Sequence, residues 1–187
     1  METKDVTKGL SLIAFGFLFT LLNITINDVS ITPSFIGWLL FFIAFPYVEK
    51  YAEGKDYLKW AALILTIVTA VQWVLEIVKA PVQLDILKTI VGVVDVVFMF
   101  LFFGVLENIV KSFNLEERAG KLRTLKFVNL ISYLGTVVFS LIYSIRQDAL
   151  FAGIAALCGI VAIISAIVTC FTLFKVKNEI ADKTAAA

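Results

Sequence analysis

Asp95 is the residue of this sequence whose position is hardest to explain by packing alone. It lies within residues 86–110, a predominantly apolar stretch long enough to cross a membrane. A charged carboxylate near the centre of a bilayer costs at least ~2.5 kcal/mol, so the group must be protonated or partnered. Two interpretations stay open. Asp95 either coordinates a substrate amine or cation, or carries a proton as part of the function, or it is a protonated carboxyl with a structural role that hydrogen-bonds to Tyr and Ser side chains of residues 127–145.

Other polar side chains recur at helical spacing, so that several apolar stretches have one polar face. In residues 127–145 the polar positions follow i, i+4, i+7, i+11 and i+14. Within lipid such a face points to protein or water. We expect one set of these residues to line a ligand-binding cavity that opens on the outer side of a membrane, with the aspartate as its floor: Asn23, Gln72, Glu76, Lys88, Asp95, Thr136, Ser140 and Tyr143.

A simpler alternative exists for part of this set. Glu76 with Lys79 and Asp85 with Lys88 are spaced i,i+3 at the ends of apolar stretches. Pairs at this spacing form ordinary salt bridges on one helix face.

Small residues form a ridge in the last apolar stretch. Ala152, Ala156 and Gly159 share a helix face that continues to residues 162 and 166. Small residues at this spacing let another helix approach closely. The ridge is expected to pack against a neighbouring helix of the same chain, or to dock a partner.

The composition excludes much of the known enzyme chemistry. The chain has no His and only two Cys, which removes histidine relays, histidine-ligated metals and CxxC redox chemistry. No G-x-S-x-G motif is present. We therefore expect no catalytic residue, no metal ligand and no cofactor. A net charge of +1 provides no basic field for nucleic acid.

The hydrophobicity of the chain indicates the elements that must position these residues. Of 187 residues, 60% are hydrophobic and 17% charged, and the mean hydropathy is +0.97. Soluble domains have roughly 45–50% apolar residues and about 25% charged residues. The sequence predicts an all-α integral membrane bundle, a single domain over residues 1–187. Its six predicted spans are residues 9–26, 34–48, 60–78, 86–110, 127–145 and 149–174.

Charge placement favours six spans over five. With the N-terminus inside, six spans place 13 of the 16 Lys and Arg residues on the inner side, where cytoplasmic loops carry them. The second span is short, and Pro46 biases Phe45 away from helical geometry. A re-entrant second segment would lower the inner share to 11 of 16. Both termini are therefore expected in the cytoplasm.

One motif resembles a known family. Residues 23–27 read Asn-Ile-Thr-Ile-Asn, and residues 31–38 read Ile-Thr-Pro-Ser-Phe-Ile-Gly-Trp. They resemble an uncharacterised family of small multi-span membrane proteins of Gram-positive bacteria, in which an Asn-rich end of span one precedes a Pro-Asp-Phe-Ile-Gly-Tyr-like start of span two. Ser34 and Trp38 stand at the Asp and Tyr positions of that pattern. The resemblance implies a bacterial cytoplasmic membrane and no particular activity.

Two classes of function follow from the sequence. The first is a protein that binds or transports a small polar or amphipathic solute through the outward cavity. The second is a non-transporting scaffold, assembly factor or regulator, in which the polar faces only hold helices together. A pocket of at least about 300 Å³ among the predicted residues would favour the first class.

Overall fold

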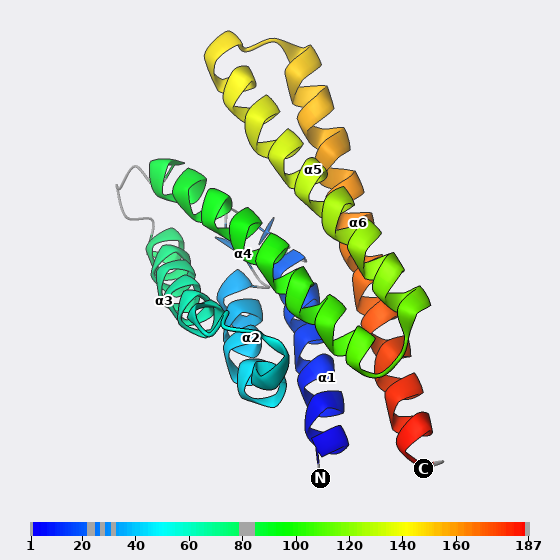
Figure 1. The fold of residues 1–187 in the computed structure, drawn as a ribbon. Coiled ribbons are helices and arrows are strands. Elements are labelled where there is room, and N and C mark those ends of the chain that lie inside the picture. The colour runs from blue at the N-terminus through cyan, green and yellow to red at the C-terminus, as the bar shows by residue number, and fades with distance from the viewer. Residues whose placement is uncertain (1, 22–24, 27–28, 31–32, 79–84, 186–187) are drawn as a thin grey trace.

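The computed structural model describes residues 2–21, 25–26, 29–30, 33–78 and 85–185, and these residues form an all-α fold (Figure 1). A two-residue antiparallel pairing and one 3-10 turn accompany six helices in this part of the chain. The helices are α1 (Glu2–Leu21), α2 (Ser34–Val48), α3 (Tyr57–Ile77), α4 (Asp85–Ser112), α5 (Glu116–Arg146) and α6 (Ala149–Ala185). The short elements are β1 (Thr25–Ile26), β2 (Val29–Ser30) and η1 (Glu49–Tyr51).

Four segments within these helices are long and apolar enough to cross a membrane. They are Tyr57–Ile77, Ile90–Ser112, Glu116–Arg146 and Ala149–Lys183. The helix α2 is shorter, with 15 residues. The helix α1 has 20 residues and begins with a charged segment, because Glu2, Lys4, Asp5 and Lys8 lie in its first two turns. Four candidate spans therefore indicate a membrane protein.

The first predicted span extends too far at its C-terminal end. It was expected to reach Ile26, but Thr25–Ile26 is the strand β1 and pairs with Val29–Ser30. Thr, Ile and Val are β-branched, and their restricted side chains favour extended backbone over helix. The helical part of the predicted segment that the structure describes therefore ends at Leu21.

The expectation for Phe45 is also wrong. The helix α2 continues through Pro46 to Val48, and Phe45 is helical and buried. A proline in the last turn removes one backbone hydrogen bond, but little helix follows it. The helix therefore ends two residues after the proline instead of breaking before it.

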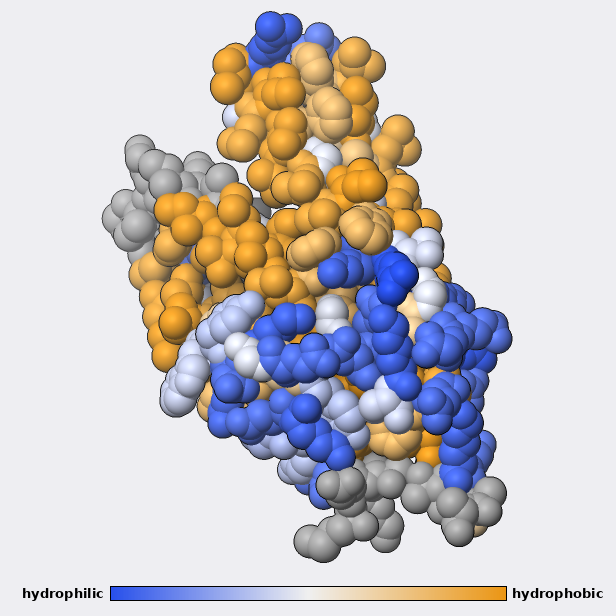
Figure 2. All heavy atoms as spheres, viewed as in Figure 1, coloured by the Kyte–Doolittle hydropathy of each residue, from blue (hydrophilic) through white to orange (hydrophobic). Residues whose placement is uncertain are grey.

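The helices alternate in direction, which gives the molecule two unlike ends. Figure 1 shows the start of α1, the end of α6, the η1 turn and the α4–α5 turn at one end, and the α5–α6 turn at the other. On the face shown in Figure 2, most hydrophilic residues gather at the first end, and hydrophobic residues cover most of the rest, apart from a few hydrophilic residues at the opposite tip. We call the first end the polar end and the opposite one the apolar end.

The helices α1 and α2 pack backbone against backbone. A Cβ atom placed on Gly37 of α2 would lie 2.7 Å from the carbonyl oxygen of Gly16 and 2.5 Å from Cγ2 of Thr20 in α1. One on Gly16 would lie 2.9 Å from the ring of Phe41. Both positions accept only glycine at this helix separation, because any side chain would occupy space already filled.

Aromatic side chains form the core that holds α1, α2 and α4 together. Trp38 meets Phe98 edge-on at a ring-centroid distance of 5.0 Å, and Phe41 meets Phe102 at 5.2 Å. Phe17 packs edge-on against Phe41 at 5.3 Å. Such pairs contribute about 0.5–1.5 kcal/mol each beyond the area they bury. The helix α4 is thereby fixed against the α1–α2 pair, and its remaining faces are left for α3 and α5.

Candidate functional site

Most polar side chains inside the long helices bond to their own backbone. Thr66 Oγ1 donates to the carbonyl of Ala62 at 2.8 Å, and Asn129 Nδ2 donates to that of Leu125 at 3.0 Å. A hydroxyl that bonds one turn back is satisfied without a partner helix. The same pattern holds for Thr20, Thr69, Thr136, Thr169 and Thr172. These bonds therefore join no two helices.

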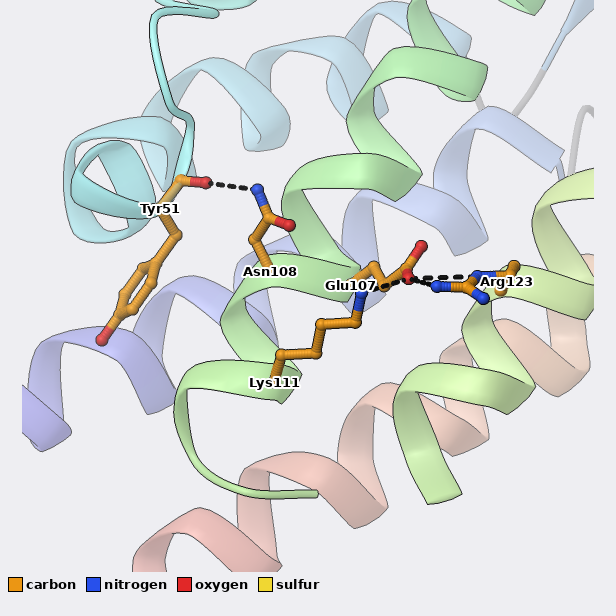
Figure 3. Close-up of polar contacts among 5 residues, drawn as sticks. All are labelled: Tyr51, Glu107, Asn108, Lys111 and Arg123. Atoms are coloured by element: carbon orange, nitrogen blue, oxygen red, sulfur yellow. Dashed lines mark hydrogen bonds and ion pairs between the residues drawn. The ribbon is translucent and has the colours of Figure 1, made fainter. Parts of the chain in front are cut away.

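Side-chain bonds between helices gather at the polar end. Figure 3 shows Glu107 of α4 accepting bonds from Arg123 of α5 at 2.5 Å and from Lys111 at 2.8 Å. Asn108 donates to the carbonyl of Tyr51 at 3.4 Å. A second ion pair, Arg118 with Glu179 at 2.6 Å, joins α5 to α6. Nearer the middle of the helices, a further bond between two of them runs from Cys170 Sγ to the carbonyl of Ala14.

A groove lies between α5 and α6, near the apolar end. Its volume is about 380 Å³. One wall carries the hydroxyl side chains of α5, and the other is the small-residue ridge of α6. The lining residues are Thr136, Ser140, Tyr143, Ala152, Ala155, Ala156 and Gly159. Two features predicted separately from the sequence are thereby brought together at one place.

The groove has a simple cause. The two helices touch along one line, and beside that line the residues of α6 are too small to fill the space between the helices. At the close line, a Cβ atom on Gly135 would lie 2.7 Å from the Sγ of Cys158. Beside it, the small Ala and Gly residues of α6 leave the groove unfilled. The hydroxyls of Ser140 and Tyr143 form no hydrogen bond with the described residues, whereas Thr136 donates to the carbonyl of Ser132 at 2.9 Å. Two hydroxyls are therefore available to a ligand.

Asp95 belongs to α4 and lies opposite the same polar face of α5. Its Oδ1 atom is buried and accepts no hydrogen bond from the part of the chain that the structure describes. The carboxyl is within electrostatic range of Tyr133. Ser140 follows Tyr133 by seven residues, which is two helical turns, or about 10 Å along the same face. The hydroxyl wall of the groove therefore leads along α5 towards Asp95.

The α4–α5 interface on the polar-end side of Asp95 is filled. The space among Phe100, Phe103, Lys126 and Asn129 amounts to about 10 Å³. Phe100 and Phe127 meet there with ring centroids 6.3 Å apart. Close packing of α4 on α5 is therefore found on the polar-end side of Asp95. Figure 1 shows the two helices diverging away from the polar end.

The remaining predicted site residues do not line this groove. Gln72 is buried on α3, and its Nε2 atom has no hydrogen-bond partner among the described residues. Glu76 lies partly buried one turn further along α3. Asn23 and the side chain of Lys88 lie outside the described part of the molecule. A cavity lined by all eight residues therefore stays a prediction, while three of them share one groove.

Sequence reasoning missed Ala155. The signal was present, because Ala152, Ala155, Ala156 and Gly159 follow the i, i+3, i+4, i+7 pattern of one helix face. A pattern of residues mainly four apart omits the i+3 position, and therefore shows a ridge only one residue wide. A ridge two residues wide leaves a groove, whereas a single line of small residues lets a helix close upon it.

The chain matches no protein-family model, no curated protein and no solved structure in the comparisons made. Among the residues described, no three His, Cys, Asp or Glu side chains are placed to hold a metal ion. The chemistry that the groove offers is that of hydroxyls on one wall, small apolar side chains on the other, and a carboxyl further along the hydroxyl face.

Proposed function

We propose that this protein binds or transports a small amphipathic solute, and that the solute occupies the groove between α5 and α6. The observation that supports it is the groove itself. Its volume of about 380 Å³ falls within the range of about 300–1,000 Å³ found for small-molecule sites. The Ala and Gly wall suits an apolar chain, and the hydroxyls of Ser140 and Tyr143 suit a polar group.

In this proposal Asp95 receives the charged part of the solute. Its buried Oδ1 lacks a hydrogen-bond donor in the described residues, and a buried polar atom without a partner costs about 1–3 kcal/mol. An amine or another cationic group would satisfy it. The solute is therefore amphipathic and carries an amine or cationic group, with its apolar portion between α5 and α6.

The proposal includes six spans in a bacterial cytoplasmic membrane, with both termini in the cytoplasm. The helices α1 and α2 lie antiparallel beside each other and complete the alternation that the four longer helices begin. With this threading the α5–α6 turn, and with it the groove, lies on the outer side. The polar end then faces the cytoplasm, in keeping with the predicted placement of 13 of the 16 Lys and Arg residues.

Single cysteines test this threading. In a background with Cys158 and Cys170 replaced by Ala, Gln147→Cys lies in the α5–α6 turn and Glu53→Cys lies between η1 and α3. A membrane-impermeant maleimide is expected to label Gln147→Cys in intact cells, and Glu53→Cys only after the membrane is permeabilised. Labelling of Glu53→Cys in intact cells would contradict the proposed threading.

Removing the two available hydroxyls tests the groove. Purified protein is titrated with dodecylamine, dodecanol and dodecanoate, and the thermal unfolding midpoint is measured. Dodecylamine is expected to raise the midpoint most, because its amine can reach Asp95. In Ser140→Ala/Tyr143→Phe the affinity for dodecanol should fall about tenfold, because its single hydroxyl then loses both partners in the groove and each hydrogen bond is worth about 0.5–1.5 kcal/mol.

The matched control is Ser144→Ala, one turn from Ser140 on the same helix. Its hydroxyl is exposed and already bonds to the carbonyl of Leu141 at 2.8 Å. It should leave probe affinity unchanged within twofold. If the double variant binds dodecanol as tightly as this control, the groove is not the binding site.

The scaffold alternative has less support. It requires the polar faces to hold helices together, whereas Thr66, Asn129 and Thr136 each bond within their own helix. A partner helix lying on the small-residue ridge would occupy the same groove. In that case the ridge would be covered in the membrane and none of the three probes would stabilise the purified complex.

A further inference from the structure

Four cationic side chains gather at the polar end, away from the groove, and two of them share one carboxylate. Lys111 and Arg123 both bond to Oε1 of Glu107, at 2.8 Å and 2.5 Å (Figure 3). The ammonium of Lys55 lies against the backbone of α4, where a Cβ atom on Gly104 would be 3.2 Å from it. Lys126 lies within electrostatic range of Glu107, Lys55 and Arg123. We call Lys55, Lys111, Arg123 and Lys126 the cationic cluster.

The cluster holds more positive charge than its own acids balance. Oε1 of Glu107 is already shared by two cations, and Glu116 adds only a long-range attraction for Arg123. Lys55 and Lys126 form no ion pair with any residue in the described ranges, and their charges repel. These cations come from the turn before α3, from α4 and from α5, so the fold gathers them against their mutual repulsion. A bound anion that is not part of the chain would offset this repulsion.

The cluster lies at the border between the polar and the apolar surface. The Lys126 ammonium is 3.8 Å from the centroid of the Phe100 ring, and the next residue, Phe127, is 49% exposed. One turn further from the polar end, Ile131 is 69% exposed. Exposed apolar side chains in a membrane protein face lipid tails, so cations directly beside them lie at the depth of lipid phosphates.

We propose that the cationic cluster binds the phosphate group of an anionic phospholipid in the leaflet at the polar end. Arg123 offers a planar fork of N–H donors, and the three lysines add ammonium donors that match phosphate oxygens. The acyl chains would lie on the exposed side chains of Phe127 and Ile131. Inorganic phosphate shares the headgroup chemistry but has no chains to use that surface. This site is separate from the groove, and its existence does not depend on the solute proposal.

Native mass spectrometry of the purified protein titrated with phosphatidylglycerol, phosphatidylcholine or inorganic phosphate tests the proposal. Phosphatidylglycerol is expected to bind at least tenfold more tightly than phosphatidylcholine. In Lys55→Ala/Lys126→Ala its affinity should fall about 30-fold, since each cation near a lipid headgroup contributes about fivefold. The control Lys121→Ala/Lys175→Ala removes two exposed cations of the same end and should change it less than twofold.

A second variant keeps the proposal testable if Lys55→Ala/Lys126→Ala does not fold. Gly104→Val displaces the Lys55 ammonium while retaining all four charges, and should weaken phosphatidylglycerol binding about fivefold. Equal binding of the two lipids, or equal effects of the test and control pairs, would overturn the proposal. So would displacement of phosphatidylglycerol by an equimolar amount of inorganic phosphate, because the site would then select a soluble anion.

Discussion

Gly37→Leu is expected to abolish the folded protein. Even a Cβ atom at this position would lie 2.5 Å from Cγ2 of Thr20 and 2.8 Å from its backbone nitrogen. Two of the three nearest atoms belong to backbone, so a change of rotamer cannot relieve the clash. Gly37→Ala alone should lower the free energy of unfolding by about 3 kcal/mol, at the upper end of the usual cost of overpacking. Leu should separate α1 from α2 and expose the aromatic core behind them.

The matched control for this prediction is Gly92→Ala in α4. A Cβ atom there meets no described atom within 4 Å. Alanine is better than glycine inside a helix by roughly 0.5–1 kcal/mol, so this variant should be as stable as the wild type or slightly more stable. The measurement is the thermal unfolding midpoint together with the yield of monodisperse protein. Similar midpoints for Gly37→Ala and Gly92→Ala would contradict the close α1–α2 contact.

Asp95→Asn is expected to separate ligand recognition from folding. The Oδ1 atom accepts no hydrogen bond from the described residues, so the amide loses no described contact and avoids the cost of burying a charge. The unfolding midpoint of the variant should equal or exceed that of the wild type. Its affinity for dodecylamine should fall at least tenfold, because a hydrogen bond to a charged group is worth about 1.5–3 kcal/mol.

Dodecanol serves as the control probe for this variant, because it has a similar chain and no charge. Its affinity should change little on replacing Asp95 with Asn. If the variant instead unfolds at a lower temperature and yields little protein, Asp95 is a structural residue that ties α4 to its neighbours. If it is stable and binds dodecylamine unchanged, Asp95 takes no part in recognition.

The helices could be predicted from apolar runs, but most of their ends could not. The predicted segment 34–48 coincides with α2, whereas the predicted segment 127–145 became Glu116–Arg146. Hydropathy marks the apolar part of a helix and not its hydrogen-bonded length. Residues 116–126 carry Glu, Arg, Lys and Leu, which are good helix formers, and they extend α5 beyond its apolar part.

The components of the groove could be predicted, but their meeting could not. The hydroxyl face of α5 follows from the spacing of Thr136, Ser140 and Tyr143, and the ridge of α6 from its Ala and Gly residues. Whether the two faces oppose each other depends on how each helix is rotated about its axis. That rotation is set by the close contact of Gly135 with Cys158, and no pattern in the sequence predicted this contact.

The cationic cluster escaped prediction for a similar reason. Lys55 is separated from Lys126 by more than two helices along the chain, and charges at a helix end are ordinarily topology signals. The register of α4 on α5 places Arg123 on Glu107, and Gly104 admits the Lys55 ammonium. Only the packed helices bring these charges to one place.

Native mass spectrometry of protein gently released from its membrane tests the central claim most directly. The wild type is compared with Ala156→Trp, which fills the groove from α6, and with Ile160→Trp, which adds the same ring at a position 53% exposed on that helix. A bound small amphipathic molecule is expected on the wild type and on Ile160→Trp, and not on Ala156→Trp. The same bound mass on all three proteins would show that the groove between α5 and α6 does not hold the solute.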